Sequence, residues 1–209
     1  MEWYILVAVI SLAICLAGII WRVVKLIRLG APVDYAPPAG KTSPAIKYSF
    51  TGAMSPTRKE SAFLHLPTYT AGIVYHLGTF LSLLLFVLAL FGLNFTGVTA
   101  MILAACLLIS FASGTGILIK RICKKALRDL SNPDDYISNI VVTLFQLMTA
   151  LGLVVPAMIP YYFLSAALLC LVFPFGKLRH AIFFFAARFH LGYFFGWRGV
   201  WPPEKLPEN

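Results

Sequence analysis

Five apolar runs, each long enough to cross a bilayer as a helix, constrain this chain more than any other feature of its sequence. A helix of about 20 apolar residues spans the roughly 30 Å of hydrocarbon in a membrane. With 60% hydrophobic and 12% charged residues, a soluble protein of 209 residues could not hide so much apolar surface. We therefore expect an all-α integral membrane protein with one membrane domain, residues 1–209, built as a five-helix bundle. The predicted spans are residues 3–21, 70–93, 97–119, 136–155 and 160–184.

The positive charges lie in only one set of connections between these runs. Of the 17 Lys and Arg, seven lie in the loop 22–69, five follow the third run and five lie in the C-terminal region. The positive-inside rule then predicts an external N-terminus, with the loop 22–69, the aromatic and basic tail 185–209 and the C-terminus in the cytoplasm. This topology explains the net charge of +9 without a nucleic-acid partner. It predicts a multi-pass protein of the cell inner (cytoplasmic) membrane, in contact with lipid.

The loop 22–69 is unusually rich in proline. Such a density argues against a helix or a strand within it. We expect a polar, Pro-rich cytoplasmic loop that is partly ordered against a partner. Its prolines are Pro32, Pro37, Pro38, Pro44, Pro56 and Pro67.

Two of the four histidines, His76 and His180, lie inside apolar runs. At 1.5 Å per residue, His76 lies about 9 Å from the cytoplasmic start of its helix, and His180 lies about 30 Å from the outer start of its helix. Both therefore fall near the cytoplasmic face. An ionisable residue at membrane depth indicates a functional site. Each has a glycine four residues earlier, Gly72 or Gly176, which leaves space on the same helical face for a flat macrocycle.

Two imidazoles at matched depth suit the two axial positions of a b-type haem. We therefore expect His76 and His180 to ligate the iron of one heme b per chain. Basic side chains on the same side of the membrane are candidates to pair with the haem propionates. They are Lys177, Arg179, Arg121 and Lys124. The alternatives are that each histidine is a hydrogen-bonded packing residue, or that His65 and His190 hold a second haem outside the bilayer.

Polar residues also recur inside the fourth run, where Asn139, Thr143 and Gln146 share one helical face. This stripe could hydrogen-bond a quinone carbonyl or face the haem. Such residues more often bond to neighbouring helices. The four cysteines have no CxxC spacing, so the chain itself lacks ligands for an iron–sulfur cluster.

Several short motifs resemble the gamma subunit of respiratory nitrate reductase over roughly residues 70–185. Leu171 to His180, with its Phe-Pro-Phe run and basic stretch before a histidine, resembles the end of that family's last helix. Tyr75-His76-Leu77-Gly78 resembles its histidine near the start of helix two. Gly116 to Arg121 resembles the end of its third helix, and Gln146 with Ala150 to Leu153 resembles its fourth. The resemblance implies a membrane cytochrome b with His76 and His180 as haem ligands.

The departures from that family imply a one-haem variant. Where the ligands of its outer haem are expected, this chain has Phe86 and, on the last helix, Tyr162. The outer haem should therefore be absent, and neither the family's quinol site nor nitrate as a substrate carries over directly. Related one- and two-haem anchors occur in heterodisulfide-reductase-like, sulfur-metabolism and hydrogenase complexes.

The sequence thus predicts a membrane-anchoring b-type cytochrome subunit of an oxidoreductase complex, either non-catalytic or quinone-reactive. It would pass electrons between the quinone/quinol pool and a cytoplasmic iron–sulfur or catalytic subunit of a respiratory complex. The alternative is a haem-free membrane scaffold or anchor subunit. A transporter is disfavoured, because all eight acidic residues lie outside the helix interiors.

Overall fold

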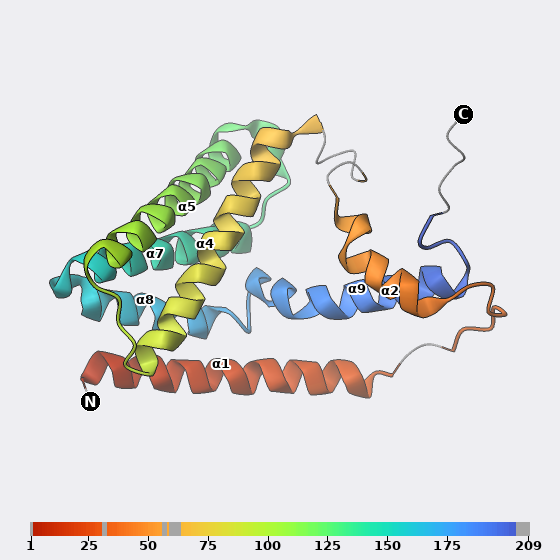
Figure 1. The fold of residues 1–209 in the computed structure, drawn as a ribbon, viewed down its shortest axis with the longest axis horizontal. Coiled ribbons are helices and arrows are strands. Elements are labelled where there is room, and N and C mark those ends of the chain that lie inside the picture. The colour runs from red at the N-terminus through yellow and green to blue at the C-terminus, as the bar shows by residue number, and fades with distance from the viewer. Residues whose placement is uncertain (1, 31–32, 56–57, 59–63, 204–209) are drawn as a thin grey trace. The chain divides into compact units, whose positions relative to one another are not determined.

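The computed structural model describes residues 2–30, 33–55, 58 and 64–203 (Figure 1). These residues form helices and connecting turns, with no strand among them. Within this part of the chain, four helices are long and apolar enough to cross a membrane, and a fifth crossing results if α8 (Ile159–Val172) and α9 (His180–Trp197) form one broken span. The expectation of an all-helical, multi-pass membrane protein is confirmed. The four are α1 (Trp3–Arg28), α4 (Leu66–Leu90), α5 (Gly97–Cys123) and α7 (Pro133–Val154).

The chain divides into two compact units, which are described separately. The first contains Met1–Trp21 and Pro67–Arg179, and the second contains Arg22–Leu66 and His180–Asn209. The first unit holds the start of α1 together with α4, α5, the short helix α6 (Lys125–Asp129), α7 and α8. The predicted single membrane domain stays a prediction.

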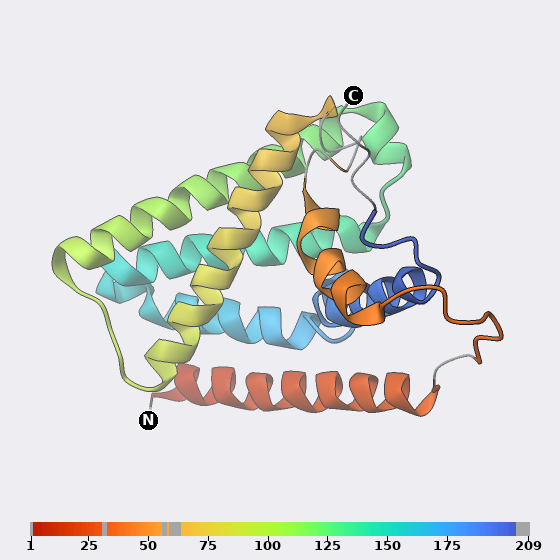
Figure 2. The ribbon, with the colours of Figure 1, turned by 45° about the vertical axis from the view of Figure 1, so that its right-hand side comes forward.

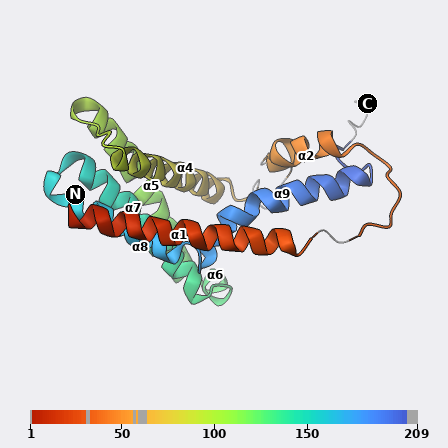
Figure 3. The same ribbon diagram turned by 90° about the horizontal axis from the view of Figure 1, so that it is seen from below.

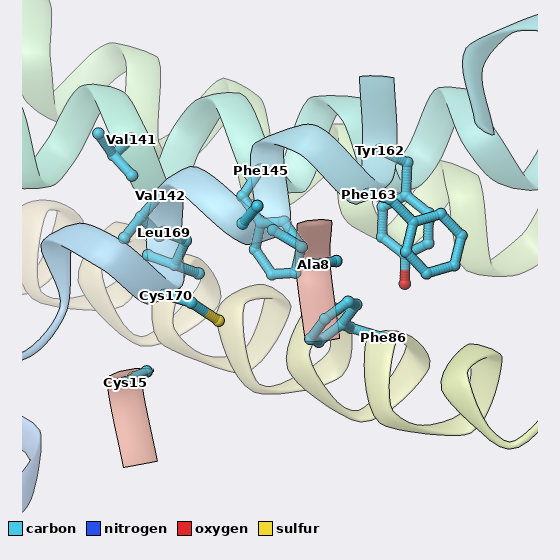
Figure 4. Packing of buried hydrophobic residues seen from close by; sticks show 12 residues of the cluster. Ala8, Cys15, Phe86, Val141, Val142, Phe145, Tyr162, Phe163, Leu169 and Cys170 are labelled. Carbon is cyan, nitrogen blue, oxygen red and sulfur yellow. The ribbon is translucent and has the colours of Figure 1, made fainter. Parts of the chain in front are cut away.

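In the first unit, α7 packs against both α5 and α8, and α4 is inclined to α7 and α8 (Figures 1 and 2). The core is aromatic: the Phe86 ring meets the rings of Phe145 and Tyr162 edge to face, with centroids 6.4 and 6.3 Å away (Figure 4). Large apolar side chains such as Leu84 and Ile109 point away from this core, 55% and 62% exposed. Such apolar outer faces suit lipid, as expected for membrane-spanning helices.

Local sequence signals fix the ends of two helices of this unit. α7 begins with a capping box, in which the Asp135 N–H donates to the Asn132 side chain at 3.1 Å and the Asn132 N–H donates back to Asp135 at 3.0 Å. Pro133 occupies the first turn, where its missing N–H costs nothing. α4 ends where Gly92 takes a positive φ of 79° and the Leu93 N–H donates to the Leu88 carbonyl at 3.0 Å.

The predicted fifth span, residues 160–184, is not one continuous helix. α8 ends at Val172, a turn follows, and the 3-10 turn Lys177–Arg179 precedes α9. Pro174 causes the break, because it has no N–H to donate and its ring clashes with the carbonyl four residues earlier. Pro174 is buried against α1, where a Cβ added at Gly18 would lie 3.0 Å from the proline Cβ.

The second unit corrects the expectation that the loop 22–69 has no helix and that 185–209 is only a tail. It contains the helix α2 (Thr42–Phe50), the 3-10 turn Gly52–Met54 and the 18-residue helix α9 (Figure 3). The prediction from proline density was wrong because of the position of Pro44. Pro44 is the third residue of α2, in the first turn, where a backbone N–H has no helical partner to lose.

Candidate functional site

His76 lies on α4 with its ring held by the backbone one turn earlier. Its Nδ1 is 2.6 Å from the Gly72 carbonyl oxygen, which can only accept a hydrogen bond. The contact therefore requires a proton on Nδ1, and in the neutral imidazole this tautomer leaves the lone pair of Nε2 available to a metal. Metal-ligating histidines almost always have their second nitrogen anchored in this way.

The surroundings of His76 are open. The side chain is exposed, and a Cβ added at Gly72 would meet no atom within 4 Å. His76 lies about 100° around the helix from Tyr75, which points between α5 and α7. The ring of His76 therefore projects from the side of α4 next to its packed face. The bare patch that the sequence predicted beside this histidine is present.

His180 is the first residue of α9 and is exposed. Gly176 does not share a helical face with it, because the helix on which that relation depended ends at Val172. A Cβ added at Gly176 would instead lie 2.7 Å from an oxygen of Asp134. The start of α7 therefore occupies the space beside Gly176. The prediction of a bare patch for a macrocycle beside His180 was wrong. His180 and His76 belong to different units, so their pairing stays a prediction.

Two of the four predicted propionate partners are directed at a carboxylate that sequence reasoning missed. Lys177 Nζ donates to the Asp135 carboxylate, and Arg121 Nη1 lies 3.7 Å from it. Arg121 also donates to the Ser131 hydroxyl at 2.8 Å. The side chain of Asp135 is only 5% exposed. Through its contacts with Arg121 and Lys177, it links the end of α5, the start of α7 and the turn after α8 in a half-buried charge cluster.

The other two predicted propionate partners, Lys124 and Arg179, are exposed. Lys124 lies between the last residue of α5 and the first residue of α6. Arg179 ends the 3-10 turn before α9. Among the described contacts, neither of these two side chains pairs with Asp135. The signal that could have revealed Asp135 is in the sequence: Asn132 followed three residues later by an acid is a helix N-terminus pattern.

The predicted polar stripe on α7 is used in hydrogen bonds between helices. Gln146 is fully buried, and its amide donates to the Tyr75 carbonyl at 2.9 Å and to the Thr79 hydroxyl at 2.8 Å. Its carbonyl accepts from the Ser110 hydroxyl at 3.1 Å. This single side chain therefore links α7 to both α4 and α5. The structure supports the alternative reading of Gln146 as an interhelical residue.

Thr143 and Asn139, which lie one and two turns before Gln146 on α7, continue the same network. The Tyr75 hydroxyl lies 3.1 Å from the Asn139 carbonyl and 3.1 Å from the Thr143 hydroxyl. Asn139 donates to the Gly114 carbonyl of α5 at 3.4 Å. Close approach of the helices requires small residues here, because a Cβ at Gly78 would collide with Ser110 and one at Gly114 would collide with Tyr75.

A cavity of about 340 Å³ lies in the first unit, at the end where the short connections are. Its walls come from the ends of α4 and α7, the loop between α4 and α5, and the start of α8. Tyr162 is one of the lining residues, and its phenol oxygen is buried without a hydrogen-bond partner among the described residues. Other lining residues include Leu85, Ala89, Thr149, Gly152 and Phe163.

The remaining histidines lie in the second unit. His65 is exposed, in the turn before Leu66. His190, on α9, lines an apolar groove of about 420 Å³ together with residues of the last turns of α1. Across the described residues, no group of three or more His, Cys, Asp or Glu could hold a metal ion. A second haem on His65 and His190 stays a prediction.

A comparison with family models, with curated proteins and with solved structures finds no match for this chain. The resemblance to the nitrate reductase gamma subunit therefore stays a prediction from the motifs.

Proposed function

We propose that this chain is a membrane-anchoring b-type cytochrome subunit. It would carry electrons between the quinone pool and a cytoplasmic iron–sulfur partner, in the cytoplasmic membrane of the cell. His76 and His180 would hold one heme b per chain. The observation that carries the proposal is the hydrogen bond from His76 Nδ1 to the Gly72 carbonyl at 2.6 Å, which leaves Nε2 free to ligate.

The residues around His76 fit a haem ligand in three respects. The carbonyl of Gly72 fixes the tautomer and the ring orientation, which also raises the basicity of Nε2. The absence of a side chain at Gly72 leaves open space on the same face of α4. The exposed position makes the ring accessible to a large group. Haem iron bound by two imidazoles would supply reversible one-electron transfer.

The basic residues of the proposed cytoplasmic side would serve two tasks. Lys124 and Arg179 are exposed and could pair with propionates or with an acidic partner surface. Arg121 and Lys177 instead neutralise Asp135 and so hold the ends of α5, α7 and α8 together. We therefore assign propionate binding to Lys124 and Arg179 before Arg121 and Lys177.

A difference spectrum of the purified full-length protein, dithionite-reduced minus oxidised, tests this proposal together with the haem content per chain. We expect one b-type haem, lost in His76→Ala and in His180→Ala. The matched control His190→Ala should retain it. Protein without haem, made with an ample haem supply, would overturn the proposal in favour of a haem-free scaffold. Two haems per chain would assign His65 and His190 as a second pair.

The quinone of this proposal needs a position other than Gln146, because the amide nitrogen and the amide oxygen of Gln146 already form hydrogen bonds between helices. We infer that the cavity lined by Tyr162 is the better candidate, because its volume is typical of small-molecule pockets and its walls are mostly apolar. The phenol of Tyr162 has no partner among the described residues and could donate to a quinone carbonyl.

A pair of neighbouring tyrosines provides a matched test of this position. Tyr162→Phe should slow quinol-driven haem reduction about tenfold, the value of one hydrogen bond of ~1.4 kcal/mol. Tyr161→Phe, at an exposed neighbour, should leave the rate unchanged. Equal rates in both variants would remove Tyr162 from the quinone site.

A further inference from the structure

Helix α9 uses one face to pack against α2 at unusually close range. A Cβ added at Gly192 would lie 2.5 Å from the Ile46 Cα, and one at Gly196 would lie 2.6 Å from the Ala45 Cβ. Ser49, fully buried, donates to the Arg188 carbonyl at 2.8 Å. This is the small-residue contact that a Gly-x-x-x-Gly spacing permits. The two helices therefore form a fixed pair, and this face of α9 is occupied.

A second face of α9 borders the groove next to the last turns of α1. Ile182, Ala186 and Phe189 line this groove from α9, and Leu26 and Ile27 line it from α1. The spacing of 182, 186 and 189 places these residues within about 60° of one another around the helix, two to four turns before Gly196 along its axis. The apolar side chains on this side therefore face other residues of the same unit.

The third face of α9 combines exposed phenylalanine with half-buried arginine. The Arg188 guanidinium lies 5.7 Å from the centroid of the Phe184 ring, and the Arg198 guanidinium lies 3.6 Å from that of Phe194. Leu191 lies between the two pairs, 41% exposed, and the phenylalanines are 37% and 45% exposed. The spacing i, i+4, i+7, i+10 and i+14 keeps these five residues on one side of the helix. We call this surface the Phe–Arg face.

The charge of the unit favours an anionic surface as the occupant of this face. Residues 22–66 and 180–209 contain ten Lys and Arg but four Asp and Glu. The two terminal guanidinium nitrogens of Arg198 donate to the carboxylate oxygens of Asp34 at 2.8 and 3.0 Å. Arg188 has no ion pair among the described residues, so its charge is available to a ligand.

The junctions of this unit favour one side of the membrane. They lie at Trp21–Arg22 within α1, at Leu66–Pro67 at the start of α4 and at Arg179–His180 before α9. If Pro156–Val172 is the fifth crossing and α9 leaves the bilayer, all three junctions lie on the same side. Trp21 and Arg22 at the first junction are residue types enriched where a helix leaves the hydrocarbon.

We propose that the Phe–Arg face of α9 lies on an anionic lipid surface, with α9 in the plane of the membrane interface. Phe184, Leu191 and Phe194 enter the boundary between headgroups and acyl chains. The guanidinium of Arg188 binds lipid phosphate, while its stacking on Phe184 keeps it over the apolar stripe. Helix α2 reaches the edge of this face, where the Phe50 ring meets the Phe184 ring edge to face with centroids 6.5 Å apart. Leu191 and Phe194 remain exposed. The proposal does not depend on haem binding.

Photocrosslinking of the full-length protein in vesicles of equal phosphatidylglycerol and phosphatidylcholine tests the proposal. We place p-benzoyl-phenylalanine at Phe194 and, as a control in the same unit, at Tyr35, which is 92% exposed. Mass spectrometry then identifies the adducts. We expect lipid adducts at Phe194 in excess of those at Tyr35, with phosphatidylglycerol enriched about fivefold over its input, the effect of one basic residue near a charged bilayer.

A charge variant then identifies the residue responsible for lipid selection. Arg188→Gln should return the ratio of the two lipids in the adducts to the input ratio. Lys125→Gln, at an exposed lysine of the first unit, should leave the enrichment unchanged. Adducts at Phe194 with a second copy of the chain, or no lipid adducts there, would overturn the proposal. Lipid adducts without enrichment would refute the role of Arg188 and the anionic specificity.

Discussion

Replacement of Gln146 by leucine distinguishes a structural role of the α7 stripe from a role in quinone binding. Leucine has a similar volume, so the change leaves no large cavity and removes only hydrogen bonds. The structure gives Gln146 three of them: to the Tyr75 carbonyl, to the Thr79 hydroxyl and from the Ser110 hydroxyl, at 2.9, 2.8 and 3.1 Å. Hydrogen bonds between membrane helices contribute about 0.6 kcal/mol each on average. We therefore expect the free energy of unfolding to fall by about 2 kcal/mol.

The partners left behind add little to this figure. The Ser110 hydroxyl can still donate to the Val74 carbonyl at 3.1 Å or to the Tyr75 carbonyl at 3.3 Å. The Thr79 hydroxyl still donates to the Tyr75 carbonyl at 2.8 Å. Neither hydroxyl is left buried without a partner, so the larger penalty for an unsatisfied group does not apply.

Unfolding by sodium dodecyl sulfate in mixed micelles, followed by tryptophan fluorescence, measures the change. Ser113→Ala is the control, because among the described residues its hydroxyl bonds only to the Ile109 carbonyl of its own helix. We expect its effect to be below about 0.5 kcal/mol. A Gln146→Leu variant as stable as the parent would refute the reasoning. In the folded variant, unchanged quinol-driven haem reduction would separately exclude Gln146 from the quinone site.

Three further predictions address the charge cluster, the close helix pair and an exposed ion pair. Asp135→Ala should lower the free energy of unfolding by about 2 kcal/mol in the same micelle assay, because it removes one half of the capping box of α7 and the acceptor of two cations. Asp129→Ala, at an exposed position, should change the free energy of unfolding little. Gly192→Leu should separate α2 from α9, because even a Cβ there has no room, and limited proteolysis should then cut the α2 segment faster. The Arg198 guanidinium donates hydrogen bonds to Asp34 and so lowers the pKa of that carboxyl. A lowered pKa in the folded state means that the contribution of the pair is present above about pH 4, the pKa of an unfolded aspartate, and is lost as the pH falls through the lower folded value. Stability measured from pH 6 down to pH 2 should show this loss in the parent protein and less of it in Arg198→Gln.

The sequence by itself determined the class of protein and the approximate place of the long helices. Length and hydropathy suffice for this, because a backbone in lipid must satisfy its polar groups within each helix. The predicted runs 70–93, 97–119 and 136–155 correspond to α4, α5 and α7, with ends that differ by a few residues. Gly72 and its relation to His76 were also readable, because both lie on one uninterrupted helix.

Only the tertiary structure decided how polar residues and breaks are used. The face shared by Asn139, Thr143 and Gln146 was predictable, but their hydrogen bonds to α4 and α5 depend on which helices approach each other. The break after Val172 moved Gly176 off the helix of His180, since one proline outweighs an apolar pattern that extends past it. The pairing of α2 with α9 depends on contacts between residues more than 130 positions apart in the sequence, such as Gly192 against Ile46. Local sequence signals describe a helix and its ends, whereas packing partners are chosen by shape and charge across the fold.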